Sequence, residues 1–309
     1  MTGLVEGSLL AGTTSLFWTI SPVCFAAAGR RIGSFHVNIF RLVIASAILG
    51  AIAALPAHFA GSTPSFAIPQ SGFIWLALSG VAGLAIGDAF YLKALTMIGA
   101  RRTTQILILA PAVSVGLAWM LLGERLGGGT LLGIGLILAG IVYSTGHEMR
   151  GVPVTNAEPG IVSTKGVAIA AIATLFQGGG AVMSREAFIA APGMDPVSAA
   201  FARVAAAAVV LTLAGCISFA IRKTGKPLFV RGAGRPLLLG TLAGPVIGMI
   251  FYLGAFKYAP AGIVSTLSSM SPILIIPVVA IRYRAAIPRE AIIGTLVSVA
   301  GVAIMAIGR

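Results

Sequence analysis

Charged residues are scarce in this chain. Asp, Glu, Lys and Arg together make up 9% of its 309 residues, whereas an ordinary soluble domain has roughly 25%. Hydrophobic residues make up 58%, and the mean hydropathy is +1.02. Every surface element of a water-soluble fold needs a hydrated face, and these residues cannot supply it. The composition therefore excludes an ordinary soluble domain and predicts that the apolar surplus faces lipid.

Residues that carry enzyme chemistry are also few. Cys24 and Cys216 both lie in apolar runs, where a thiol is more often a small buried hydrophobe than half of a disulfide. No Walker loop occurs, and His147-Glu148 lacks the second histidine of a zinc motif. Residues 85–88 (AIGD) lack the first glycine of the G-x-G-D arrangement of intramembrane aspartyl proteases. We therefore expect neither enzymatic activity nor a bound metal or cofactor.

Acidic residues number eight against 21 Lys and Arg, which gives a net charge of +13. In a soluble protein this excess would indicate a nucleic-acid partner. Here the basic residues lie in short gaps between apolar runs, as the orientation of a membrane protein requires. We therefore expect a lipid bilayer, and no nucleic acid, as the partner.

Long apolar runs dominate what remains. A spanning helix needs about 20 mostly apolar residues, and polar, turn-rich stretches such as His147–Thr164 separate such runs. The sequence predicts an all-α membrane protein with ten transmembrane helices. We place them at Leu4–Ala28, His36–Pro56, Gly72–Ala94, Ala100–Leu122, Thr130–Gly146, Lys165–Ala190, Pro196–Ala220, Pro236–Tyr258, Ala261–Ile281 and Ile287–Gly308.

The chain also repeats itself. FYLKAL from Phe90 aligns with FYLGAF from Phe251, and the same offset pairs two prolines and two pairs of glycines without a gap. We therefore divide the chain into a first five-helix repeat (1–150), a polar linker (151–164) and a second five-helix repeat (165–309). Because each repeat has an odd number of spans, the second must enter the membrane from the opposite side, and the repeats are expected to be inverted.

The positive charges agree with inversion, because they gather in connectors that fall on one face. By the positive-inside rule this face is cytoplasmic, so both termini are expected outside the inner (plasma) membrane. The residues concerned are Arg30, Arg31, Lys93, Arg101, Arg102, Arg222, Lys223, Lys226, Arg231, Arg235, Arg282, Arg284 and Arg289.

Several of these segments resemble the EamA family of the drug/metabolite transporter superfamily. The resemblance lies in Asn38-Ile39-Phe40-Arg41, FYLKAL, Ala110-Pro111 and Leu121–Tyr143 (LLGERLGGGTLLGIGLILAGIVY). Residues 281–286 (IRYRAA) depart from it, because the family pattern would repeat LGE there. The resemblance implies a ten-helix carrier of two five-helix repeats that moves small metabolites, such as amino acids or related polar compounds, often outward. It also implies cytoplasmic termini, against the charge distribution.

An ionisable group at membrane depth indicates a functional or structural role, since its insertion into the membrane costs roughly 2.5–3.5 kcal/mol. Asp88 and Tyr91 are three residues apart and share a helix face. They are candidates for a proton or substrate-amine site, with a structural pairing of Asp88 to an arginine as the equal alternative. The repeat-related Arg41 and Arg203 are candidates for binding a substrate carboxylate, although such arginines more often anchor a helix at the interface.

Uncharged polar and aromatic residues complete the candidate binding site. Trp18 and Gln177 occupy matched positions in the two repeats, and Tyr252 is the counterpart of Tyr91. Gln105 and a stripe of Ser265, Ser268 and Ser269 give polar faces to two further spans, where plain interhelical hydrogen bonding is the alternative.

Pro111 and Pro272 are the proline pair at equivalent depth. A proline frees a backbone carbonyl and kinks a spanning helix, so these two are candidate hinges for alternating access. Together these features predict a carrier of small molecules, with proton coupling as one candidate drive. The other readings are a membrane scaffold or regulator that transports nothing, and a flippase for lipids or lipid-linked sugars.

Overall fold

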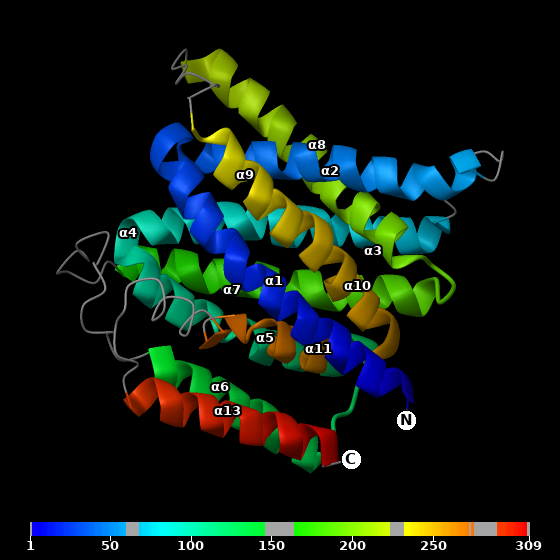
Figure 1. Cartoon of the computed structure of the whole chain (residues 1–309), viewed down its shortest axis with the longest axis vertical. Helices are drawn as coiled ribbons and strands as arrows, with labels where there is room; N and C mark the ends of the chain where they lie inside the picture. Colours follow the sequence, from blue (N-terminus) through cyan, green and yellow to red (C-terminus); the bar gives the residue numbers. More distant parts are fainter. Residues whose placement is uncertain are drawn as a thin grey trace.

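The computed structural model describes residues 2–59, 68–145, 164–222, 232–271, 273–274 and 289–307, and within these ranges it contains helices and no strand (Figure 1). The first half comprises α1 (Thr2–Ile32), α2 (Ser34–Phe59), α3 (Gln70–Gly80), the π-helix η1 (Val81–Gly87), α4 (Asp88–Leu107), α5 (Ala110–Leu122) and α6 (Gly128–Thr145). The second half comprises α7 (Thr164–Ala190), α8 (Pro196–Arg222), α9 (Gly234–Thr241), the π-helix η2 (Leu242–Gly248), α10 (Met249–Tyr258), α11 (Ala261–Ser268) and α13 (Arg289–Ile307).

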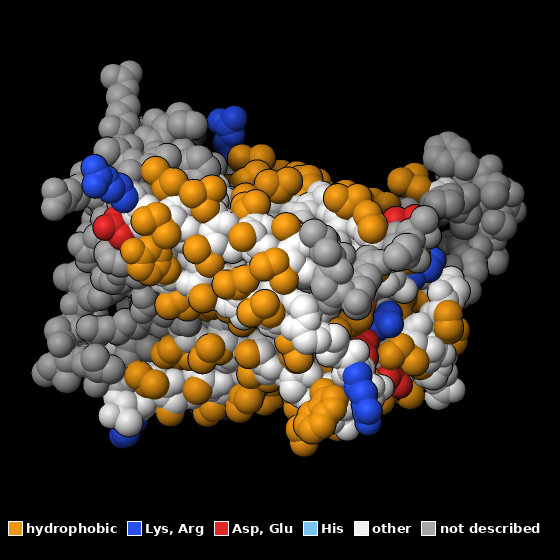
Figure 2. Space-filling view, turned by 90° about the horizontal axis from the view of Figure 1, so that it is seen from below, with side chains coloured by type: hydrophobic (Ala, Val, Ile, Leu, Met, Phe, Trp, Pro, Cys, Tyr) orange, Lys and Arg blue, Asp and Glu red, His pale blue; other side chains and the backbone are white. Residues whose placement is uncertain are grey.

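The helices have the length and surface that a membrane requires. Six helical segments are long and apolar enough to cross a bilayer, and each is one helix or a continuous series of helices. They are Gly3–Gly29, Phe35–Leu55, Gln70–Tyr91, Thr164–Ala190, Pro196–Cys216 and Gly234–Tyr258. Shorter apolar helices lie at Ala110–Leu122, Gly128–Tyr143 and Ile292–Ile304. Figure 2 shows hydrophobic side chains across the middle of one face and charged side chains toward its two ends. The expected all-α membrane fold is confirmed, while residues 275–281 of the expected ninth span lie outside the described residues.

The two halves interlock through their first helices. The contacts of α1 are mainly with α9, η2, α10 and α11 of the second half, and those of α7 are mainly with α3, η1, α4 and α5 of the first. Both ends of the described chain lie on the same side of the bundle (Figure 1), as an even number of spans requires. Inverted five-helix repeats account for this exchange, because each half supplies the helix that completes the other.

One helix break occurs at the same place in both repeats. In the first half, α4 ends at Leu107, four residues before Pro111, and the amide of Leu109 donates to the carbonyl of Ile106. Proline cannot donate to the carbonyl four residues earlier, and its ring collides with that carbonyl. In the second half, α11 ends at Ser268, the repeat equivalent of Leu107, and the Met270 amide donates to Leu267 in the same way.

A second break occurs in the second half alone. The sequence predicts a connector between Ala94 and Ala100, but α4 runs through these residues to Leu107. In the second half, α10 stops at Tyr258, and Ala259 is extended at φ −130° and ψ 150° before Pro260. The residue before a proline is forced out of the helical region, and Gly99 stands where the second half has Pro260. The expected connector is therefore wrong because the first half lacks this proline.

Both repeats also contain a π-helix at the same place. The helices η1 and η2 each have seven residues, and their first residues, Val81 and Leu242, are equivalent in the repeat. They lie directly before Asp88 and Met249, the first residues of α4 and α10. Segments of π-helix are rare and are frequent at functional sites, so these two direct attention to the residues that follow them.

The last helices of the repeats, α6 and α13, pack against each other along glycines (Figure 1). A Cβ on Gly301 would lie 2.7 Å from the carbonyl oxygen of Gly133, and one on Gly140 would overlap the carbonyl oxygen of Gly294. The two contacts are related by the repeat, since Gly294 is the equivalent of Gly133 and Gly301 is the equivalent of Gly140. Small residues of this kind let transmembrane helices approach closely.

Candidate functional site

A cavity of about 90 Å³ lies between the two halves. It has room for several water molecules, since one needs about 10–15 Å³. Trp18, Gln177 and Met249 lie near the middle of their membrane-spanning segments, which places the cavity near the centre of the bilayer. The residues that line it are Trp18, Leu84, Ala110, Pro111 and Ser114 from the first half, and Gln177, Arg203, Met249, Tyr252, Ser265, Ser268 and Ser269 from the second.

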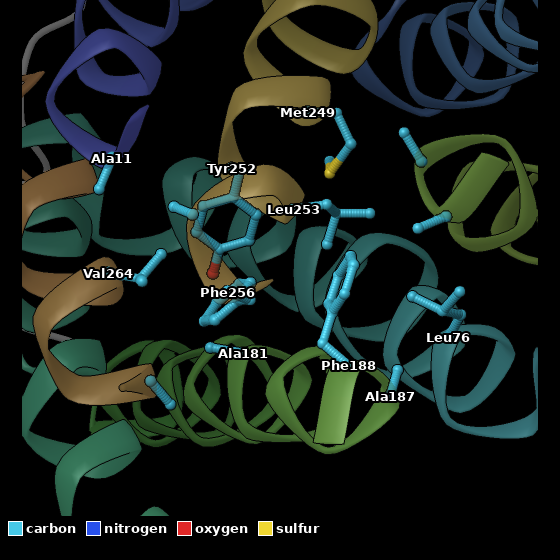
Figure 3. Packing of buried hydrophobic residues seen from close by; sticks show 14 of the residues in the cluster. Ala11, Leu76, Ala181, Ala187, Phe188, Met249, Tyr252, Leu253, Phe256 and Val264 are labelled. Atoms are coloured by element: carbon cyan, nitrogen blue, oxygen red, sulfur yellow. The ribbon is translucent and has the colours of Figure 1, made fainter. Parts of the chain in front are cut away.

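Helix α10 is the wall between this cavity and the buried core. Tyr252 lines the cavity, while Leu253 and Phe256 on the same helix are fully buried. Figure 3 shows Leu253 and Phe256 facing Ala181 and Phe188 of α7. The ring of Tyr252 also packs against Trp18 of α1, with 4.9 Å between the ring centroids. An aromatic cluster therefore fixes the position of the cavity wall.

Arg203 is the charged group of this cavity, and its side chain is almost wholly buried, with 2% of the residue exposed. Its Nη1 donates to Ser184 Oγ, which lies 2.8 Å from Ser79 Oγ of the first half. Its guanidinium also lies 5.4 Å from the centre of the Tyr252 ring, in a cation–π arrangement. A Cβ on Gly80 would overlap the Arg203 carbonyl, so a glycine is what lets α8 approach α3 here.

Two buried polar atoms at this cavity lack a hydrogen-bond partner within the described residues. They are Arg203 Nε, a donor, and Ser268 Oγ, which can donate or accept. Buried polar groups are nearly always hydrogen-bonded, and leaving one unpaired costs roughly 1–3 kcal/mol. Both unpaired atoms belong to residues of the same small cavity, so the cavity is built to receive something polar.

A second polar network lies beside the cavity and contains Asp88. Arg41 forms an ion pair with Asp88 Oδ2, and Gln177 Nε2 donates to Asp88 Oδ1 at 2.6 Å. Arg41 is held in turn by Asn38 Oδ1, 2.8 Å from its Nε, and by the Phe25 ring. Both oxygens of this carboxylate are engaged, and the bond from Gln177 joins the two halves.

The charges at the centre of the molecule do not balance. Arg41 and Arg203 are cations, and the carboxylate that interacts electrostatically with both of them is Asp88. Among the described residues that line the cavity, Arg203 is the cation and none is acidic. The site formed by the cavity and the Asp88 network therefore carries a net charge of about +1, which attracts a negatively charged ligand.

A third network joins the halves near the ends of α5 and α7. Arg185 Nε donates to Glu124 Oε1 at 2.9 Å, and the amide of Ala261, the first residue of α11, donates to Glu124 Oε2 at 3.0 Å. Arg185 Nη1 also donates to the carbonyl oxygen of Phe256 at 2.5 Å. Arg185 is eight residues beyond Gln177 on α7, which is about 12 Å along the helix. This neutral pair closes the contact between α5, α7 and α11 away from the cavity.

The structure thus distributes the candidate residues over several places. Trp18, Gln177, Arg203, Tyr252 and Ser268 line the cavity together with Pro111. Asp88 and Arg41 form the adjacent network, and Tyr91 follows Asp88 on α4 without lining the cavity. Gln105 lies in α4, but its side chain is outside the described residues, as is Pro272.

Sequence reasoning overlooked several residues of these networks. Ser79, Ser114 and Ser184 are buried serines whose role depends on a partner in the other half. Glu124 and Arg185 were not predicted as site residues either, although the sequence gives a reason to consider Arg185. It is an ionisable residue within the expected sixth span, and such a residue is a candidate by default.

Comparison with known proteins gives one family and one fold. Residues 5–146 and 164–307 each match the model of the EamA-like transporter family. A solved structure, described only as the crystal structure of a protein, is similar with a TM-score of 0.74 and 20% sequence identity, over 98% of this chain and 97% of that chain. At that identity the likeness shows the fold alone. No curated protein matches the sequence.

Proposed function

The chain belongs to the EamA-like transporter family, and we propose that it is a secondary active transporter that moves small polar metabolites by alternating access. The observation that carries the proposal is the polar cavity near the membrane centre, lined by residues of both inverted halves. Binding sites at the interface of inverted repeats are typical of secondary transporters. The inner (plasma) membrane, export as the direction, and amino acids or related compounds as cargo belong to the same proposal.

The helix breaks support movement about this cavity. Pro111 lines it directly, and the break before Pro111 has a counterpart at Ser268, which lines it from the other half. A break leaves backbone groups free of the helical ladder and lets the two segments change their angle at low cost. We propose that the two breaks, at Pro111 and before Pro272, are hinges on which the halves rock.

Coupling to protons is a further part of the proposal, with Asp88 as the group that takes up the proton. Its carboxylate joins Arg41 of the first half to Gln177 of the second, so protonation would weaken a link between the halves.

The test is transport by the purified protein in proteoliposomes, with and without an imposed proton gradient. We expect uptake of small polar solutes that is absent from protein-free liposomes and reduced at least about tenfold by Asp88→Asn or Arg203→Ala, because each loses a charge-assisted contact. Arg289→Gln, at the exposed start of α13, is the matched control and should transport like the wild type. Unchanged transport in both site variants would remove the site assignment.

A second measurement separates a carrier from a scaffold. Single cysteines at positions 88 and 203, in a background without Cys24 and Cys216, should react with a water-soluble thiol reagent in intact membranes. A carrier exposes its cavity to water in at least one state, whereas a scaffold has no need to. Failure of both positions to react, with a single cysteine at the exposed position 289 reacting as the positive control, would contradict alternating access.

A further inference from the structure

The cavity contains more than an unspecified polar lining. Arg203 is buried, its Nη1 is occupied by Ser184, and its Nε has no partner among the described residues. A guanidinium N–H donates a charge-assisted hydrogen bond to a carboxylate, and such a bond is stronger than one between neutral groups. The bond to Ser184 holds the guanidinium in place, and the Nε N–H is the donor that is left for a ligand.

Ser268 supplies a second, independent observation. Its hydroxyl is buried, lines the same cavity and has no partner among the described residues. The neighbouring hydroxyls are already engaged, because Ser265 bonds to Ser114 at 3.0 Å and Ser269 bonds to the carbonyl of Ser265 at 2.7 Å. An unpaired guanidinium N–H and an unpaired hydroxyl around one cavity are donors that call for an acceptor.

Charge decides which acceptor fits. Asp88, the nearby carboxylate, is already bound by Arg41 and Gln177, so among the described residues no free carboxylate faces the cavity to receive an ammonium group. A cationic substrate would meet the charge of Arg203 without compensation, and repulsion between like charges is costly inside a membrane protein, where water screens them little. A zwitterion would satisfy Arg203 and leave its ammonium with uncharged partners alone among the described residues that line the cavity.

We infer that the transported substrate is a small carboxylate of net negative charge, whose carboxylate accepts hydrogen bonds from Nε of Arg203 and from the hydroxyl of Ser268. The cavity volume of about 90 Å³ restricts the substrate to a few non-hydrogen atoms in this conformation. This inference rests on the proposed transport function and restricts the proposed cargo to anionic carboxylates, which leaves out zwitterionic amino acids such as alanine. It makes Arg203 and Ser268 the groups that select the charge of the substrate.

Ligand-induced thermal stabilisation of the purified protein in detergent tests the inference apart from transport. The probes are acetate and pyruvate as carboxylates, alanine as a zwitterion, methylammonium as a cation, glycerol as a neutral solute, and chloride as a simple anion. We expect acetate and pyruvate to raise the melting temperature, and alanine, methylammonium, glycerol and chloride to have clearly smaller effects at equal concentration.

Variants locate the effect. Arg203→Gln should abolish the stabilisation by carboxylates, and Arg203→Lys should keep a weakened part of it, because the positive charge remains while the Nε donor is lost. Ser268→Ala should lower the affinity for pyruvate at least about tenfold, as expected for a hydrogen bond to a charged group. Because Ser268 Oγ has no partner to lose among the described residues, the melting temperature of Ser268→Ala without ligand should stay near that of the wild type. Arg289→Gln is the matched control for the loss of a positive charge.

Several results would overturn the inference. These are stabilisation by methylammonium or glycerol in place of carboxylates, equal stabilisation by chloride, no stabilisation by either carboxylate, and carboxylate stabilisation that persists in both Arg203→Gln and Ser268→Ala. Transport of a neutral or cationic solute in proteoliposomes would leave the transporter assignment standing and reject the carboxylate. Absence of all transport, with carboxylate binding intact, would reject the transporter assignment and leave the carboxylate as the ligand of the cavity.

Discussion

The two halves share a backbone plan and differ in their chemistry. Each has an arginine in its second span, Arg41 and Arg203, but Arg41 has Asp88 as an ion-pair partner whereas Arg203 bonds to the hydroxyl of Ser184. The position equivalent to Asp88 is Met249, which lines the cavity beside Arg203. A repeat can therefore keep its helix breaks and π-helices while one exchange, of a carboxylate for a thioether, converts a neutral pair into an unsatisfied cation.

The difference assigns separate tasks to the two halves. In the first half, Asp88 holds Arg41 and, through Gln177, reaches across to the second half. In the second half, Arg203 and Ser268 leave donors unused at the cavity. We therefore expect substitutions in the first-half network to change the association of the halves, and those around Arg203 to change what is bound.

The largest expected effect is that of Asp88→Asn on stability. Removing one partner of an ion pair in an apolar setting leaves the other charge uncompensated, which costs roughly 3–5 kcal/mol for a buried pair. Because Arg41 and Asp88 retain side-chain exposures of 18% and 13%, we expect the lower end of that range, about 3 kcal/mol. The free energy of unfolding in mixed detergent micelles measures it. The double variant Asp88→Asn with Arg41→Gln should recover most of the loss, and a double variant no more stable than Asp88→Asn would contradict the pairing.

Next comes Met249→Asp, which gives the second half the carboxylate of the first. The new charge would lie at the cavity beside Arg203, compete for its guanidinium and lower the affinity for carboxylates about 10- to 100-fold, since a hydrogen bond to a charged group contributes roughly 1.5–3 kcal/mol. Titration of pyruvate by thermal shift measures the affinity. The side chain of Met249→Asn has nearly the same shape as that of Met249→Asp but no charge, so this variant should lose much less affinity for pyruvate. Equal affinities of the Asp and Asn variants would show that Arg203 does not select the charge.

Gly140→Leu and Gly301→Leu test the part of the molecule in which the halves are most alike. Each larger side chain would push against the backbone of the facing helix, and overpacking of this kind costs about 1–3 kcal/mol. Because the two contacts are related by the repeat, we expect similar losses, and a double variant that loses less than the sum because both changes separate the same pair of helices. Gly135→Leu, on α6 with open space around its Cβ position, is the control for lower helix flexibility. Unfolding free energies of the four variants decide the matter.

The smallest expected effect is that of Pro245→Leu. Pro245 lies inside η2, whereas the equivalent residue of η1 is Leu84. Because η1 forms its π-helix without a proline, we expect η2 to keep its geometry and the variant to lose about 1 kcal/mol, the low end of the range for a larger side chain in a packed site. The melting temperature measures the change. A large loss of stability, with a melting temperature near that of the wild type for the matched variant Leu84→Met, would mean that η2 depends on its proline and that η1 forms for another reason.

Much of the fold follows from local sequence features. The apolar runs predict the spans, and the uniform offset between the repeats predicts that α4 and α10 begin at equivalent places. The expected connector between Ala94 and Ala100 is wrong. The second half ends its helix before Pro260, and the apolar pattern alone does not show that a connector needs such a residue. The break before Pro111 could be predicted, since a proline acts on its own helix.

The candidate site was predicted in part. Arg203, Gln177, Tyr252 and Ser268 stood out as polar residues in apolar spans, and they do lie around one cavity. The link from Arg203 to Ser79 through Ser184 was not predicted. Serines are common in membrane helices, and the sequence does not show which of them has a hydrogen-bond partner on another helix. The roles of Asp88, Arg41 and Tyr91 in transport stay predictions.

By itself the sequence determined that this protein lies in a membrane, is helical and is built twice, because hydropathy, proline positions and repeat spacing act within one segment and need no neighbour. Only the tertiary structure decided which of two equivalent arginines has a carboxylate partner and which lines the cavity with an Nε that is unpaired among the described residues. Charges are paired by distances between helices, and a difference of a few ångströms between two side chains separates an ion pair from a binding site.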